Sequence, residues 1–250
     1  MKPAFTVHSP ETATDYTVYI DAPAGSAAAE PSTAMLFMDG DDQFPAALGA
    51  YRAARRFDDI PPLMLVGLGY GASYSRPANK RGRDYTPTFH SDEPASGGAE
   101  LFCHFLTDTL WPELARRYSL RNDQRGVAGH SLGSLLALYA LWREPSFFTH
   151  CLASAPSIWW DDRSLLKVIA DRHAKNPRLS AQLYLSVGEN DSASMTGDLT
   201  LLEQQLRTAP FEGLKVTSRR FPRRNHFNVL PDAFQNGLVS LFGKSGSRGH

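Results

Sequence analysis

The feature that most constrains the fold of this chain is a regular alternation of strand-type and helix-type segments. Two of the expected strands, 34–38 and 63–66, are continuous apolar runs, which are typical of strands covered on both faces. Strands are expected at 16–21, 34–38, 63–66, 126–128, 150–154, 183–187 and 214–221. Helices are expected at 44–57, 97–118, 132–143, 164–174, 197–208 and 231–242. The alternation predicts an α/β fold with a mostly parallel central sheet and helices on both faces.

The length and charge balance narrow the classes of protein to which the chain can belong. At 250 residues it has a normal length for one α/β domain, so residues 1–250 are predicted to form a single domain. The 26 basic residues equal the 26 acidic ones, which argues against a nucleic acid partner. No apolar run reaches the roughly 18 to 20 residues that span a bilayer, so no membrane partner is expected.

The first ten residues and the two cysteines bear on the compartment. Residues 1–10 lack the apolar stretch of a signal peptide, which favours the cytoplasm, or the periplasm if a leader has been removed. Cys103 and Cys151 fall in an expected helix and an expected strand, where they are predicted to be buried thiols without a redox role.

The segment 71–96 is the longest stretch without a regular pattern. It is rich in Ser, Pro, Gly and Arg. Connections of this length in compact domains are usually functional or mobile, so the segment is a candidate lid over an active site. The preceding residues 67–72 match the G-x-G-x-x-A dinucleotide fingerprint, but the residues after them lack the apolar stripe of the helix that this fingerprint requires.

The most informative motif is Gly129-His130-Ser131-Leu132-Gly133, which matches the G-x-S-x-G pattern. In this pattern a serine occupies a tight turn between a strand and a helix, and its hydroxyl is raised above the sheet. An expected strand precedes the motif and an apolar helix follows it, as the pattern requires. Ser131 is therefore the predicted nucleophile, and the Leu132 N–H is a predicted oxyanion donor.

A serine nucleophile needs a histidine base. In hydrolases with a G-x-S-x-G turn, this histidine follows the serine in the chain. Four histidines come after Ser131, namely His150, His173, His226 and His250. His150 begins an expected buried strand, His173 lies near the end of an expected helix, and His250 is the last residue. Only His226 lies between the last expected strand and the last expected helix, so it is the predicted base.

The orienting acid is expected just after the strand that ends at Val187. Asp191 fits the usual spacing best, and Glu189 is the alternative. The second oxyanion donor is expected in the acidic loop 39–42, from the backbone N–H of Asp41 or Asp42. This acidic loop lacks the calcium-binding spacing, so no metal site is predicted.

Several segments resemble the esterase-D-like α/β-hydrolases, and within them the trilactone siderophore esterases. They are the Ser131 elbow together with 66–70, 81–87, 97–99 and 154–160. The resemblance runs from about Tyr16 to Phe242 and implies an α/β-hydrolase fold with no separate cap domain and no organic cofactor. It also implies cleavage of the trilactone backbone of ferric enterobactin, salmochelin or bacillibactin, with Ser131, His226 and Asp191 as nucleophile, base and acid.

The distribution of arginines and aromatic residues suggests how an anionic substrate is held. Arg76 and Arg81 lie in segment 71–96, Arg224 lies beside His226, and Trp159 follows an expected strand end. A ferric tris-catecholate is anionic and aromatic, and guanidinium groups pair with such anions and stack on their rings. These four residues are the predicted substrate contacts. A general carboxylesterase, a thioesterase and an acyltransferase of the same fold are the alternatives.

Overall fold

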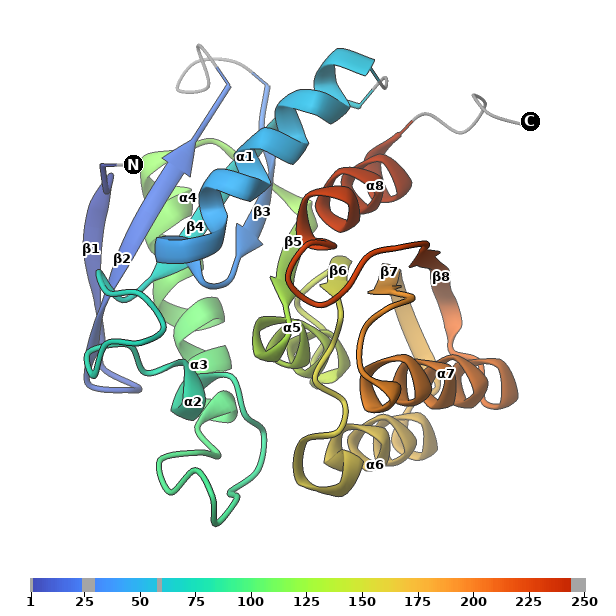
Figure 1. Cartoon of the computed structure of the whole chain (residues 1–250). Coiled ribbons are helices and arrows are strands. Elements are labelled where there is room, and N and C mark those ends of the chain that lie inside the picture. Colours follow the sequence, from blue (N-terminus) through green and yellow to red (C-terminus); the bar gives the residue numbers. More distant parts are fainter. Residues whose placement is uncertain (1, 24–29, 58–59, 244–250) are drawn as a thin grey trace.

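The fold is built on one eight-stranded sheet, shown in Figure 1, in a computed structural model that describes residues 2–23, 30–57 and 60–243. The strands are β1 Phe5–Ser9, β2 Thr14–Asp21, β3 Ser32–Phe37, β4 Leu63–Gly69, β5 Leu120–His130, β6 His150–Ser154, β7 Arg178–Gly188 and β8 Glu212–Phe221. Their order across the sheet is β1-β2-β4-β3-β5-β6-β7-β8. The pairings β1–β2 and β2–β4 are antiparallel and the others are parallel, as the alternation predicts.

Helices cover both faces of this sheet (Figure 1). They are α1 Gly40–Phe57, α2 Arg81–Asp84, α3 Ala99–His104, the π-helix η1 Phe105–Leu110, α4 Trp111–Arg117, α5 Leu132–Trp142, α6 Trp160–Lys175, α7 Ala193–Thr208 and α8 Leu230–Phe242. Helices α1 and α8 pack on each other and on one face, while α5 and α7 pack on the other.

Strand β3 illustrates why the central strands are continuous apolar runs. Met35 and Phe37 belong to the core under α1 and α8, whereas Ala34 and Leu36 belong to the core on the opposite face. Successive side chains of a strand point to opposite faces, so a strand between two helical layers needs apolar residues at every position.

Three elements differ from the sequence-based expectation. Strand β1 was not expected, because its partly exposed side chains leave only a weak apolar pattern. Strand β5 begins at Leu120 and not at residue 126. Its first half is polar and exposed, so the apolar pattern marks only its second half. The expected helix 97–118 consists of the contiguous elements α3, η1 and α4, and Pro112 is the second residue of α4, directly after the π-helical turn.

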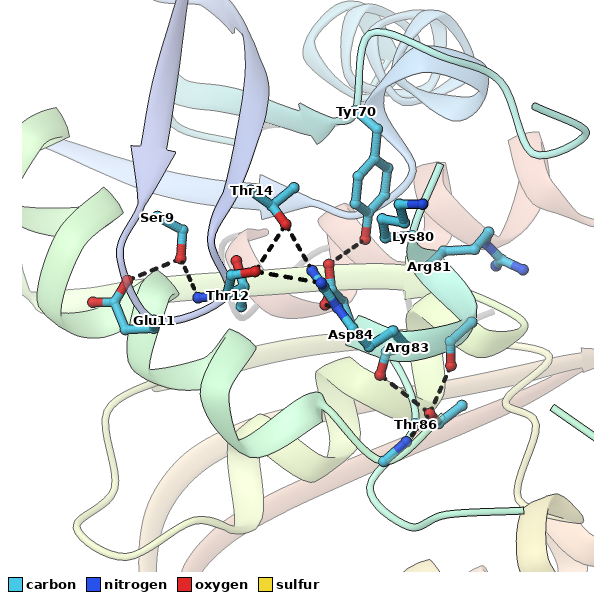
Figure 2. A network of polar contacts seen from close by, with 12 residues as sticks. Ser9, Glu11, Thr12, Thr14, Tyr70, Lys80, Arg81, Arg83, Asp84 and Thr86 are labelled. Carbon is cyan, nitrogen blue, oxygen red and sulfur yellow. Dashed lines mark hydrogen bonds and ion pairs between the residues drawn. The ribbon is translucent and has the colours of Figure 1, made fainter. Parts of the chain in front are cut away.

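Segment 71–96 is anchored to the body of the protein at its centre. Asp84 is fully buried and accepts hydrogen bonds from the hydroxyls of Tyr70 at 3.0 Å (Figure 2) and Tyr16 at 2.7 Å. Arg83 donates to Asp84 at 2.6 Å and to Thr14 of the β1–β2 hairpin at 2.9 Å. These contacts fix Arg83 and Asp84 to the body of the protein, and a lid over the active site formed by segment 71–96 stays a prediction.

No helix among the described ranges is long and apolar enough to cross a membrane.

Candidate active site

The predicted nucleophile lies on a strained turn between β5 and α5. Ser131 has φ 59° and ψ −123°, a conformation that non-glycine residues rarely adopt. The turn is tight because a Cβ on Gly129 would lie 2.1 Å from the carbonyl carbon of Gly133. The two glycines therefore permit the turn that presents the Ser131 hydroxyl at the carboxyl end of the sheet.

The structure brings His226 and Asp191 together. Asp191 Oδ2 lies 3.0 Å from His226 Nδ1, and its other oxygen accepts a hydrogen bond from the Ser192 N–H at 2.7 Å. The Glu189 side chain is exposed, and its backbone N–H donates to the Phe221 carbonyl. Of the two acids considered from the sequence, Asp191 is the one in contact with the histidine.

Close backbone packing sets this contact between two loops. The Asn190 N–H donates to the Arg224 carbonyl at 2.8 Å. A Cβ on Gly188 would lie 2.4 Å from the same carbonyl oxygen, so a side chain at this position would separate the two loops. Backbone contacts therefore hold the loop that follows β7 against the loop that follows β8, independently of the side chains that the two loops carry.

His130 packs against the His226 ring. The two rings are 4.6 Å apart between centroids, and His130 Nδ1 lies 3.1 Å from the Ser154 hydroxyl. Burial, followed by the nearby His226, lowers the pKa of His130 to about 3. His130 is therefore neutral at physiological pH and packs against His226 without opposing a positive charge on it.

Ser157 contacts the predicted nucleophile and was not singled out from the sequence. Its hydroxyl lies 3.3 Å from the Ser131 hydroxyl, and its N–H donates to the Ser131 carbonyl at 3.3 Å. Ser157 is fully buried and follows Ala155, which has a positive φ of 44°. Among the described residues, the hydrogen-bond partner of the Ser131 hydroxyl is Ser157 and not His226. The sequence signal was its place in segment 154–160, which resembles the esterase family but does not show which of its residues contacts the nucleophile.

The predicted oxyanion donors occupy the starts of two helices. Leu132 is the first residue of α5, where an N–H has no acceptor within the helix. The Asp42 N–H donates to the Asp39 carbonyl at 3.1 Å, which leaves Asp41 as the better of the two candidates in the acidic loop. A Cβ on Gly133 would lie 3.0 Å from the Asp39 carboxylate, so this loop and the elbow are in close contact.

Arg81 holds this acidic loop in place through its guanidinium group. Its guanidinium donates two hydrogen bonds to the buried Asp39 carboxylate, at 2.8 and 3.1 Å, and lies over the ring of Tyr74. The Asp39 N–H donates to the Tyr85 hydroxyl at 3.1 Å. The Arg81 charge therefore compensates a buried carboxylate, and its contact with substrate stays a prediction.

A cavity of about 420 Å³ opens beside Ser131. It is lined by Ser131, Ser157, Trp159, Asn190, Asp191, Ser192, Met195, Asn225, His226 and Phe227. Of the four predicted substrate contacts, only Trp159 belongs to this lining. The Arg224 guanidinium pairs with Asp232 at 2.5 Å and Arg76 is exposed on segment 71–96, so their contacts with substrate stay predictions.

The other histidines that follow Ser131 lie elsewhere. His150, the first residue of β6, stacks on Phe242 at the end of α8. His173 packs edge-on against Phe211. His250 lies outside the described residues. The geometry therefore agrees with the choice of His226, which contacts Asp191 and lines the same cavity as Ser131.

A serine on a strained elbow, facing one cavity with a carboxylate–histidine pair, is the arrangement of serine hydrolases. The family described as "Putative esterase" matches residues 9–230 of the chain. The chain belongs to this esterase family. Membership confirms the resemblance found in the sequence and makes the protein a serine ester hydrolase.

Individual relatives of this esterase agree with the family assignment. It is 27% identical over 235 residues to the ferri-bacillibactin esterase BesA of Bacillus subtilis (strain 168), covering 86% of this chain and 81% of the relative. It is 32% identical over 160 residues to the siderophore enterobactin esterase of Emericella nidulans, covering 57% of this chain and 52% of the relative. The crystal structure of the BES protein from Bacillus cereus matches with a TM-score of 0.84 at 23% identity, covering 95% of this chain and 93% of that one. This likeness confirms the predicted fold.

Proposed function

We propose that this esterase hydrolyses the trilactone backbone of a ferric catecholate siderophore. The proposal rests on one observation above all: the elbow serine and the Asp191–His226 pair line one cavity with the aromatic side chain of Trp159. The substrate is supported by two relatives that are named as siderophore esterases. One matches most of this chain and the other matches just over half of it.

Acylation begins when His226 accepts the proton of Ser131 and the serine oxygen attacks a lactone carbonyl. Asp191 holds the imidazole in the required tautomer and stabilises the imidazolium that forms. The negative charge on the carbonyl oxygen is stabilised by the N–H groups of Leu132 and Asp41. Collapse of the tetrahedral intermediate breaks the lactone C–O bond, and His226 returns the proton to the departing alkoxide.

Deacylation uses the same residues. His226 removes a proton from a water molecule, which attacks the acyl carbon, and the Ser131 oxygen leaves with the proton. The free Ser131 hydroxyl contacts Ser157, so its side chain must turn toward His226 when the substrate binds. Catalytic hydrogen bonds that are long in a free enzyme commonly form only in the complex.

Arg76 and Trp159 are the proposed contacts for the catecholate groups. Arg76 would pair with their negative charge, and Trp159 would stack on their rings.

Incubation of ferric enterobactin with the wild-type protein and with Ser131→Ala, followed by chromatography of the products, tests the proposal. We expect ring-opened products with the wild type and intact trilactone with the variant. Intact trilactone in both samples would contradict the substrate. If the wild type then hydrolysed short p-nitrophenyl esters, the protein would be a general carboxylesterase. If added alcohols received the acyl group, it would be an acyltransferase.

A further inference from the structure

We propose that Phe227 and Trp159 form an aromatic subsite that binds an aryl ring on the acyl side of the scissile ester. The inference deepens the proposed function and rests on it for the identity of the ring. In a serine trilactone of the catecholate type, an amide joins the aryl group to the carbon next to each scissile carbonyl. The ring of the acyl unit therefore arrives within a few bonds of Ser131.

Phe227 is an exposed aromatic residue whose backbone is held in place. Its side chain is 89% exposed. The Asn225 side-chain oxygen accepts hydrogen bonds from the N–H groups of Phe227 at 3.0 Å and Asn228 at 3.1 Å. Asn228 in turn accepts from the Asn225 N–H at 2.7 Å. These hydrogen bonds from two asparagines fix the turn that presents the Phe227 ring to solvent. A ring on a fixed turn loses little conformational freedom when a ligand binds to it.

The position of the Phe227 ring ties it to the catalytic groups. It lies edge-on against the His226 ring, with centroids 5.6 Å apart and planes at 89°. Both residues line the same cavity as Ser131. A ligand ring that rests on Phe227 is therefore brought next to the base that must act on the Ser131 proton.

Trp159 supplies a second aromatic surface of this cavity. It is 45% exposed and packs against Trp160, with ring centroids 6.0 Å apart. Trp160 is buried and donates through its indole nitrogen to the Thr88 carbonyl at 3.2 Å. Met195, buried at the start of α7, adds an apolar surface to the same lining. Aromatic and thioether groups favour the faces and edges of a bound aromatic ring.

Two small esters test the subsite without a siderophore. N-benzoylserine methyl ester carries a ring at the expected place, and N-acetylserine methyl ester lacks it. We expect the wild type to favour the benzoyl ester by about tenfold in kcat/KM, equivalent to about 1.4 kcal/mol. Phe227→Ala should reduce this ratio to near unity with the acetyl ester little affected. Phe227→Tyr, which keeps a ring, should retain the preference.

Phe57→Ala is the matched control, because Phe57 is 64% exposed but lies at the far end of α1. It should leave the ratio unchanged, and unchanged Tm values should show that all three variants are folded. An equal ratio for Phe227→Ala and the wild type overturns the subsite, even if ferric enterobactin is hydrolysed. Conversely, an aryl preference lost in Phe227→Ala, in an enzyme that leaves ferric enterobactin intact, supports the subsite and contradicts only the proposed substrate.

Discussion

His226 Nδ1 and Asp191 Oδ2 lie 3.0 Å apart, although 35 residues separate them in the chain. The contact depends on the backbone hydrogen bond between Asn190 and Arg224 and on the close approach of Gly188 to the same carbonyl. The carboxylate is nearly buried, with 4% of its side chain exposed, so solvent weakens this contact little.

Replacing the acid tests its role in orienting the base. Asp191→Asn should lower kcat/KM by about 10² to 10⁴, because an amide can hold the imidazole in the wrong tautomer. Glu189→Gln is the control, since that exposed side chain should be dispensable. Steady-state kinetics on a p-nitrophenyl ester would measure both. Equal losses in the two variants would argue against Asp191 as the orienting acid.

The contact between Ser157 and Ser131 predicts a role in positioning the nucleophile. Ser157→Ala should slow the labelling of Ser131 by a fluorophosphonate by about tenfold, because the serine hydroxyl loses its hydrogen-bond partner. The labelling rate depends on the nucleophile and not on the choice of ester. Ser186→Ala, which removes an equally buried hydroxyl from β7, should label at the wild-type rate. The prediction fails if the two variants react equally fast.

The Asp39–Arg81 pair predicts a large loss of stability when only the arginine is removed. Arg81→Ala should lower the free energy of unfolding by about 3 to 5 kcal/mol, because it leaves a buried carboxylate without its partner. Urea denaturation measures this, and Arg178→Ala, from an exposed ion pair, should have a much smaller effect. Adding Asp39→Asn to Arg81→Ala should recover part of the loss. No recovery in the double variant would mean that the uncompensated charge is not the cause.

Two buried histidines predict that acid destabilises the protein. Burial lowers the pKa of His130 to about 3 and that of His150 to about 4, from the ordinary value of 6.5. Below pH 6.5 the unfolded chain gains protons that the folded protein does not accept. The stability is therefore full above pH 6.5 and falls as the pH is lowered toward about 4, by up to about 1.4 kcal/mol per pH unit for each histidine.

Urea denaturation curves between neutral pH and about pH 5 would measure this dependence. His150→Gln should reduce the slope, because the substituted side chain does not titrate. An unchanged slope in this variant would show that His150 is not responsible.

The mostly parallel sheet and the elbow at Ser131 followed from sequence patterns. Central strands such as 34–38 were recognisable because burial on both faces demands uninterrupted apolar residues. The elbow at Ser131 was recognisable because a tight turn between strand and helix requires glycine at fixed spacing. Both are local constraints, which one short segment of sequence records by itself. Strand β1 was missed because a half-exposed edge strand imposes no such constraint.

Which side chains meet across different segments was decided only by the tertiary structure. Glu189 and Asp191 are both acids after the same strand, and the backbone packing of two loops determines which of them reaches His226. Arg81 and Arg224 were predicted to contact the substrate, but in the folded protein Arg81 pairs with Asp39 and Arg224 pairs with Asp232. The sequence specifies which side chains are charged but not where they point. The direction depends on contacts that exist only once the sheet has assembled.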